Sequence, residues 1–128
     1  MCPSNSYFFT TQLTSTEIFK LKCKLQSKTK KDENCKLWTG AQRNGYGILE
    51  VRFRGNKIKL PVHRLTYFLE NRCLPLQADM HVSHLCHNKL CCEILHLSFE
   101  PQKINNNRQI CKSNGECSGH HGYQNCTF

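Results

Sequence analysis

The sequence has little apolar material and no long hydrophobic run. Only 38% of its 128 residues are hydrophobic, and the mean hydropathy is -0.57. No stretch is long and apolar enough to span a bilayer. Met1 to Thr10 contain no basic segment followed by an apolar run, so they predict no secretory signal. We therefore expect an intracellular, thiol-reducing location without a membrane segment.

Acidic residues are also scarce. There are 9 Asp and Glu against 18 Lys and Arg, which gives a formal charge of +9. Such a surface attracts polyanions, and nucleic acid is the partner it predicts first. The alternative is a basic surface with no partner. For a protein that acts on DNA we expect a nuclear location.

Cysteine and histidine, by contrast, are abundant. The chain holds 10 Cys and 7 His. A chain of this size with a small core needs covalent or metal cross-links to hold its fold. The missing signal favours metal over disulfides. A glycosylation sequon at Asn125, Cys126 and Thr127 would matter only in a secreted chain.

The N-terminal part predicts one amphipathic helix. Thr14 and Glu17 have the spacing of a capping box, and the apolar residues that follow recur on one face from Ser15 to about Gln26. Lysines occupy the other face and the stretch after it. They predict a solvated face or a basic linker, with a phosphate-contacting arm as the alternative.

The stretch from Lys36 to Leu60 changes to a period of two. Polar and apolar residues alternate on both sides of Gly55-Asn56, which predicts an antiparallel hairpin with one apolar and one basic face. Such ribbons fit the major groove of DNA, although a basic face can equally be a solvent face. The candidate DNA contacts on the hairpin are Arg52, Arg54, Lys57 and Lys59.

Three further elements follow. Pro61 opens a short helix through about Asn71, with Arg64 near its start as a further candidate DNA contact. Met80 begins a short strand that leads into a Cys/His loop ending near Cys92. Pro101 opens a last helix to about Ile110, and the tail from Cys111 has no hydrophobic period and depends on metal or disulfides for order.

Two groups of residues have the spacing of tetrahedral zinc sites. Cys86, Cys91 and His96 are evenly spaced, and Cys35 is the expected fourth ligand, which would pin the hairpin to the loop. The second group lies within the tail. It comprises Cys111, Cys117, His120 or His121, and Cys126. Disulfide pairing is the alternative for both groups.

His84 and Asn105 remain as polar residues without a structural task. A strand His and a helix Asn can meet across one cleft, where the His takes a proton from water and the Asn oxygen holds a divalent ion. That arrangement suits phosphodiester hydrolysis. The alternative is that both residues only satisfy local hydrogen bonds.

A longer pattern connects these groups. It comprises Ser83-His84-Leu85-Cys86-His87-Asn88, Cys91, Leu95-His96-Leu97, Asn105, Arg108, Cys111, Cys117 and Cys126, preceded by Cys35-Lys36-Leu37-Trp38-Thr39-Gly40, Gly45-Tyr46-Gly47 and His63-Arg64. These residues resemble the His-Cys box of homing endonucleases in the His-Me finger (ββα-metal) superfamily, together with the zinc-binding region that accompanies it. The resemblance covers about Cys35 to Cys126.

The resemblance implies an α+β fold stapled by two zinc ions, with a ββα-metal active site. It also implies an antiparallel sheet that reads double-stranded DNA, and cleavage of both strands by a homodimer. His84 matches the general base and Asn105 the Mg2+ ligand. Cys35, Cys86, Cys91 and His96 match the first zinc site, and Cys111, Cys117, His120 and Cys126 match the second, with His120 favoured over His121.

The chain departs from the family pattern at three places. Glu93-Ile94 replaces the Asn-Pro that often precedes Leu-His-Leu. The arginine that braces the phosphate has three candidates, Arg52, Arg54 and Arg64. The C-terminal arm that some members exchange between subunits is expected to be missing, which bears on dimerisation.

These observations divide the chain into an N-terminal helix and basic linker over residues 1–34 and a zinc-binding endonuclease domain over residues 35–128. A Mg2+-dependent endodeoxyribonuclease is the function they predict. A zinc-stabilised DNA-binding module without catalysis is the first alternative, although it has no need for both His84 and Asn105. A secreted, disulfide-rich protein is the second.

Overall fold

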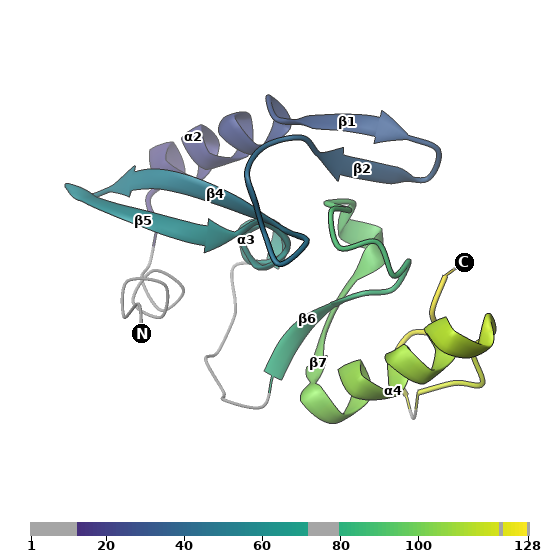
Figure 1. The fold of residues 1–128 in the computed structure, drawn as a ribbon. Coiled ribbons are helices and arrows are strands. Elements are labelled where there is room, and N and C mark those ends of the chain that lie inside the picture. The colour runs from purple at the N-terminus through teal and green to yellow at the C-terminus, as the bar shows by residue number, and fades with distance from the viewer. Residues whose placement is uncertain (1–12, 72–79, 121, 128) are drawn as a thin grey trace.

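The computed structural model describes residues 13–71, 80–120 and 122–127. Helix α2 (Ser15–Gln26) and the strands of two hairpins lie at one end of the fold, and helix α4 (Gln102–Asn114) lies at the other (Figure 1). Helix α3 (Val62–Asn71) contacts elements of both parts. The architecture is α+β with antiparallel pairing in every sheet of the described residues, as the sequence predicts.

Helix α2 (Ser15–Gln26) begins at the predicted capping box. The Thr14 amide donates to Glu17 Oε1 at 2.9 Å, and the Glu17 amide donates to Thr14 Oγ1 at 3.1 Å. These bonds satisfy two amides that the first turn leaves without helical partners. Ile18, Leu21 and Leu25 form the buried face of the helix. The predicted helix is confirmed.

Part of the basic stretch expected as a linker forms a strand instead. β1 (Thr29–Asp32) pairs antiparallel with β2 (Cys35–Trp38), and Thr29 lies opposite Trp38. The side chains of β1 are polar and mostly exposed. The strand therefore exists through its backbone pairing with β2 rather than through burial of its own side chains. It holds Cys35 near the end of a hairpin.

The central sheet has the order β3-β4-β5, with β3 (Gln42–Arg43), β4 (Tyr46–Phe53) and β5 (Asn56–Pro61). The β4–β5 hairpin is the predicted one. It turns at residues 54–55, where Arg54 (φ 49°) and Gly55 (φ 87°) adopt left-handed conformations. Alternate side chains of both strands are buried, so one face supplies the core and the other carries the basic residues.

Trp38 at the end of β2 has its indole packed against two glycines. It is 2% exposed, and its Nε1 donates to the Ala41 carbonyl at 2.9 Å. A Cβ added at Gly47 would lie 2.6 Å from Trp38 Cδ1, and one at Gly40 would lie 2.7 Å from Trp38 Cζ2. The glycines are therefore needed for the close approach of the ring.

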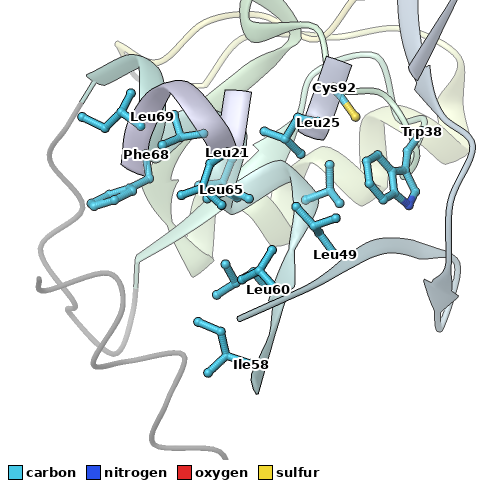
Figure 2. Close-up of a cluster of buried hydrophobic side chains, with 14 of the residues drawn as sticks. Leu21, Leu25, Trp38, Leu49, Ile58, Leu60, Leu65, Phe68, Leu69 and Cys92 are labelled. Carbon is cyan, nitrogen blue, oxygen red and sulfur yellow. The ribbon is translucent and has the colours of Figure 1, made fainter. Parts of the chain in front are cut away.

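The apolar core joins α2, the β4–β5 hairpin and α3 (Figure 2). Leu60 and Leu65 are fully buried in it, and Trp38 and Cys92 extend it toward the Cys/His loop. Because α2 contributes to the same core, this helix packs against the β4–β5 hairpin and α3. None of the helices in the described ranges combines the length and apolar character that a membrane span requires.

The remaining elements form a ββα unit. β6 (Met80–His84) pairs antiparallel with β7 (Leu97–Pro101), and α4 (Gln102–Asn114) follows at once. The β6–β7 loop contains the short helix η1 (Ile94–His96). β7 was not predicted from its residues, and α4 runs one turn beyond the expected end at Ile110. It stops at Gly115, which takes the left-handed conformation (φ 76°) common just past helix ends.

Candidate metal centres and active site

The first candidate metal centre joins the β2 hairpin to the loop between β6 and β7. Cys35, Cys86, Cys91 and His96 place their four ligand atoms within 4.8 Å of one another. Cys35 Sγ lies 3.7 Å from Cys86 Sγ and 3.6 Å from His96 Nδ1, and Cys91 Sγ lies 3.3 Å from the same nitrogen. Zn–S bonds of about 2.3 Å in a tetrahedron require S···S edges of about 3.7 Å and S···N edges of about 3.5 Å. The set therefore has the size of a zinc tetrahedron.

Backbone pairing aligns Cys35 with the loop. The Trp38 amide donates to the Leu90 carbonyl at 2.8 Å, and the Cys92 amide donates to the Lys36 carbonyl at 2.6 Å. Strand β2 is thus hydrogen-bonded to the loop on both sides of Cys91, with a bridge between Leu37 and Cys91. These backbone bonds hold Cys35 beside the loop ligands without a contribution from a metal ion.

Glu93 caps the short helix in this loop. Its side chain accepts from the Leu95 amide at 3.4 Å and caps η1, the short helix that presents His96. The Glu93-Ile94 departure from the family pattern therefore leaves a capped turn, and the ligand remains in place.

The second candidate metal centre lies at the end of α4 and in the tail. Cys111, Cys117, His120 and Cys126 again place four ligand atoms within 4.8 Å of one another. The three Sγ atoms lie 3.5, 3.2 and 3.4 Å from His120 Nε2. His120 is the histidine of this set and is 3% exposed. His121 lies outside the described residues.

Donors around this centre favour thiolates. The Cys126 amide donates to Cys117 Sγ at 3.3 Å and lowers the pKa of that thiol. Arg108 Nη1 donates to Cys126 Sγ at 3.3 Å. Zinc binds the thiolate form, so donors of this kind support the site from outside the ligand set. Both Cys3His sets fit a structural zinc ion.

Arg108 connects this centre to the ββα unit. Its guanidinium donates from Nε to Glu100 Oε2 at 2.6 Å and from Nη2 to Glu100 Oε1 at 2.7 Å. Nη2 also donates to the Gln124 carbonyl at 2.8 Å. Arg108 is 1% exposed and Glu100 is 0% exposed, so the pair is buried. It locks β7, α4 and the metal-binding tail together.

His84 and Asn105 line one cleft. The cleft has a volume of about 50 Å³, enough for a cation and a few waters, and lies between the end of β6, α4 and the loop after β6. Its other polar lining residues include Ser83, His87, Lys89 and Lys112. None of the described residues that line it carries a carboxylate.

The ring of His84 is held in one orientation. The ring makes a hydrogen bond to the backbone of Cys91, and this bond favours the protonated ring, as a bond to a carbonyl oxygen does. The other ring nitrogen, Nε2, has no partner within the described residues. Nδ1 therefore carries the hydrogen and Nε2 the lone pair. Burial lowers the pKa of His84 to about 4, the Cys91 bond opposes the shift, and the charge of Lys89 adds to it. The ring is neutral at pH 7.

Two rings pack against His84. The centroids of His63 and Tyr46 lie 4.8 and 5.9 Å from that of His84. Burial lowers the pKa of His63 to about 3, so this second imidazole is also neutral. These two ring contacts leave little room for rotation of the His84 ring.

Asn105 is held by Ser83. Ser83 Oγ donates to Asn105 Oδ1 at 2.9 Å, and the hydroxyl also lies within hydrogen-bonding reach of Glu100. Burial would raise the pKa of Glu100, but its hydrogen bonds, those from Arg108 first, outweigh burial and hold the pKa of this carboxyl below its usual value. An ionised Glu100 therefore lies behind Ser83, on the side of Arg108.

A scan against protein-family models finds one match to these centres. The model for the zinc-binding loop region of homing endonuclease matches residues 22–127, which include all eight candidate zinc ligands. The chain belongs to this family. Searches of curated proteins and of solved structures returned no match.

Within this homing-endonuclease family member, the basic residues predicted to contact DNA lie apart from the cleft. Arg52, Lys57 and Lys59 are exposed on the β4–β5 hairpin. Arg54 pairs with Glu17 of α2 through Nε and Nη2 at 3.0 and 2.9 Å. Arg64 is half-buried on α3. None of the three candidate phosphate-bracing arginines lines the cleft.

Sequence reasoning missed several residues of this family member's cleft. Ser83 and Arg108 occur in the quoted motif, but no role was predicted for them. Lys89 and Lys112 line the cleft and were not predicted at all. Lys112 had a usable signal, since Asn105, Arg108, Gln109 and Lys112 follow helical spacing on one face. No sequence signal indicated the role of Glu100, because its burial depends on the ion pair with Arg108.

Proposed function

We propose that this protein is a Mg2+-dependent endonuclease that hydrolyses phosphodiester bonds in double-stranded DNA. The observation that carries the proposal is the cleft, where a neutral, unpartnered His84 Nε2 and the amide of Asn105 face a common space that no carboxylate of the described residues lines. A magnesium ion prefers oxygen ligands and often takes them from the substrate phosphate. Membership of the homing-endonuclease family supports DNA as the substrate.

His84 is the general base in this proposal. Its Nε2 takes a proton from a water molecule as the water oxygen bonds to phosphorus. The bond between phosphorus and the 3′ oxygen breaks, and the 3′ oxygen takes a proton from solvent, which leaves a 3′ hydroxyl and a 5′ phosphate. The hydrogen bond to the Cys91 backbone and the neighbouring rings of His63 and Tyr46 keep Nε2 directed toward the reacting water.

Asn105 is the protein ligand of the divalent ion. Bound there, the ion would stabilise charge on the phosphate and on the leaving 3′ oxygen. Ser83 holds the Asn105 amide by donating to Oδ1 at 2.9 Å. Among the described lining residues, the oxygens offered to the ion belong to neutral groups, so substrate and water supply the remaining ligands. The residues fit the ion when DNA is present.

The test is cleavage of supercoiled plasmid by zinc-loaded protein with Mg2+ or with EDTA. We expect Mg2+-dependent nicking or linearisation that His84→Ala and Asn105→Ala each reduce by about 100-fold or more while both retain their zinc. Asn106→Ala is the matched control, because Asn106 is exposed on the same helix. Zinc-loaded wild type that retards the plasmid but never cuts it would point to the DNA-binding module instead.

The same gel addresses subunit number. One active site cuts one strand, so concerted linear product requires two chains on the DNA. We propose a homodimer for double-strand cleavage, and a product that remains nicked at every protein concentration would contradict it.

A further inference from the structure

Two lysines face the cleft from different elements. Lys89 lies in the loop after β6, between the ligands Cys86 and Cys91, and Lys112 lies in the last turns of α4. Within the described residues, neither ammonium group pairs with a carboxylate. Since none of the described lining residues is acidic, the two lysines give this part of the cleft positive charge. A space of this kind is suited to an anion.

Lys89 is fixed in its position by β4 and the turn before it. A Cβ added at Gly45 would lie 3.4 Å from Lys89 Cδ, so the aliphatic chain passes across the Gly45 backbone. The ammonium nitrogen then lies 4.8 Å from the centroid of the Tyr46 ring, as in a cation–π contact. The same ring packs against His84. Lys89 is therefore held beside the base, unlike an ordinary surface lysine.

Lys112 lies further along the same wall. Asn105 and Lys112 are on one face of α4, about 10 Å apart along the axis at 1.5 Å per residue. Arg108, which lies between them, is committed to Glu100, Gln124 and Cys126. Lys112 is therefore the cationic side chain on this face of α4 that is positioned to bind a second anionic group.

We propose that Lys89 binds the scissile phosphate, as a further catalytic residue of the proposed nuclease reaction, and that Lys112 binds a neighbouring phosphate of the same strand. The inference rests on the proposed function. A lysine ammonium acts as a point charge on the non-bridging oxygens, whose charge grows as the water attacks. Lys89 then performs the phosphate bracing for which Arg52, Arg54 and Arg64 are out of place.

The first experiment measures single-turnover cleavage of a DNA duplex. Lys89→Met should lower the rate at saturating protein by on the order of 100-fold, and Lys89→Arg should restore most of it. Lys36→Met is the matched control, because Lys36 is exposed and also adjoins a ligand of the first zinc centre but lies outside the cleft. Only protein with both zinc ions is compared. Lys89→Gln replaces Lys89→Met if the latter does not fold.

The second experiment measures DNA binding against salt in a His84→Ala background, which does not cut. Loss of one phosphate contact reduces the slope of log K against log salt by about 0.9. We expect that reduction for Lys89→Met and for Lys112→Met, and an unchanged slope for Lys36→Met. Unchanged slopes for both cleft variants would overturn the inference.

The two proposals fail in different ways. If the wild type never cuts DNA, the nuclease function and the catalytic role of Lys89 fall together, and the salt slopes still decide whether the lysines hold phosphate. If the wild type cuts and Lys89→Met cuts equally fast, the nuclease function stands and the role of Lys89 is wrong.

Discussion

Replacement of Arg108 by methionine should be among the most destabilising single changes in the fold. The variant keeps a similar length but removes a guanidinium that is 1% exposed. Both oxygens of Glu100, itself 0% exposed, would lose their charged donors at 2.6 and 2.7 Å. Breaking a buried pair by removing one partner costs about 3–5 kcal/mol, because the other charge stays buried. Small domains have only about 5–15 kcal/mol of stability in total.

The assay is urea unfolding of zinc-loaded protein, followed by circular dichroism. Arg108→Met should lower the free energy of unfolding by about 3–5 kcal/mol, while the exposed Lys103→Met on the same helix should change it by less than about 0.5 kcal/mol. The double variant Arg108→Met/Glu100→Leu should be less destabilised than the sum of the single variants, since no charge is left buried. Arg108→Lys keeps the charge but cannot donate to both Glu100 oxygens at once as the guanidinium does, so its free energy of unfolding should lie between those of wild type and Arg108→Met.

A small effect would refute this reasoning. If Arg108→Met unfolds within about 1 kcal/mol of wild type and both zinc ions remain bound, Glu100 is accommodated without its partner. The Arg108 link between the ββα unit and the second metal centre would then be dispensable.

Three other changes test separate parts of the molecule. Cys91→Ser should reduce bound zinc from two equivalents to one by mass spectrometry, because the second set has its own four ligands; loss of both ions would contradict independent centres. Gly47→Ala should lower stability by about 1–3 kcal/mol in urea unfolding, since its Cβ would lie 2.6 Å from a Trp38 carbon; an unchanged midpoint would contradict the close approach. Ser83→Ala should raise the Mg2+ concentration needed for half-maximal cleavage, because Asn105 loses the hydrogen bond that positions it, and Ser83→Thr should restore part of the loss; the same requirement as wild type would exclude a positioning role.

The sequence predicted the elements that depend on local signals. The capping box at Thr14 and Glu17 and the alternation along β4 and β5 involve residues close together in the chain, so both patterns can be recognised in the sequence alone. The metal ligands could be proposed because clustered Cys and His have few other uses in a small basic chain. Their spacing divided them into two sets, and the family resemblance favoured His120 over His121.

The parts that were missed depend on partners far along the chain. β1 has no apolar face, and it is a strand because β2 pairs with it. β7 buries Glu100, which no hydrophobic pattern predicts, because the charge is matched by Arg108 eight residues later. Lys89 lies between two ligands of the zinc loop, so its neighbours drew attention to metal binding rather than to the cleft.

The two metal centres differ in how much chain each encloses, and this difference sets an order of assembly. Cys35 and Cys86 are 51 residues apart, whereas the pairs Cys111–His120 and Cys117–Cys126 each span only nine. Closing the longer loop costs about 1.5 kcal/mol more chain entropy. We therefore expect zinc added to the denatured chain to fill the tail first, and the hairpin site only as both ends of the fold come together. Stopped-flow absorbance of a cobalt-substituted chain would separate the two events, and the second should coincide with burial of Trp38.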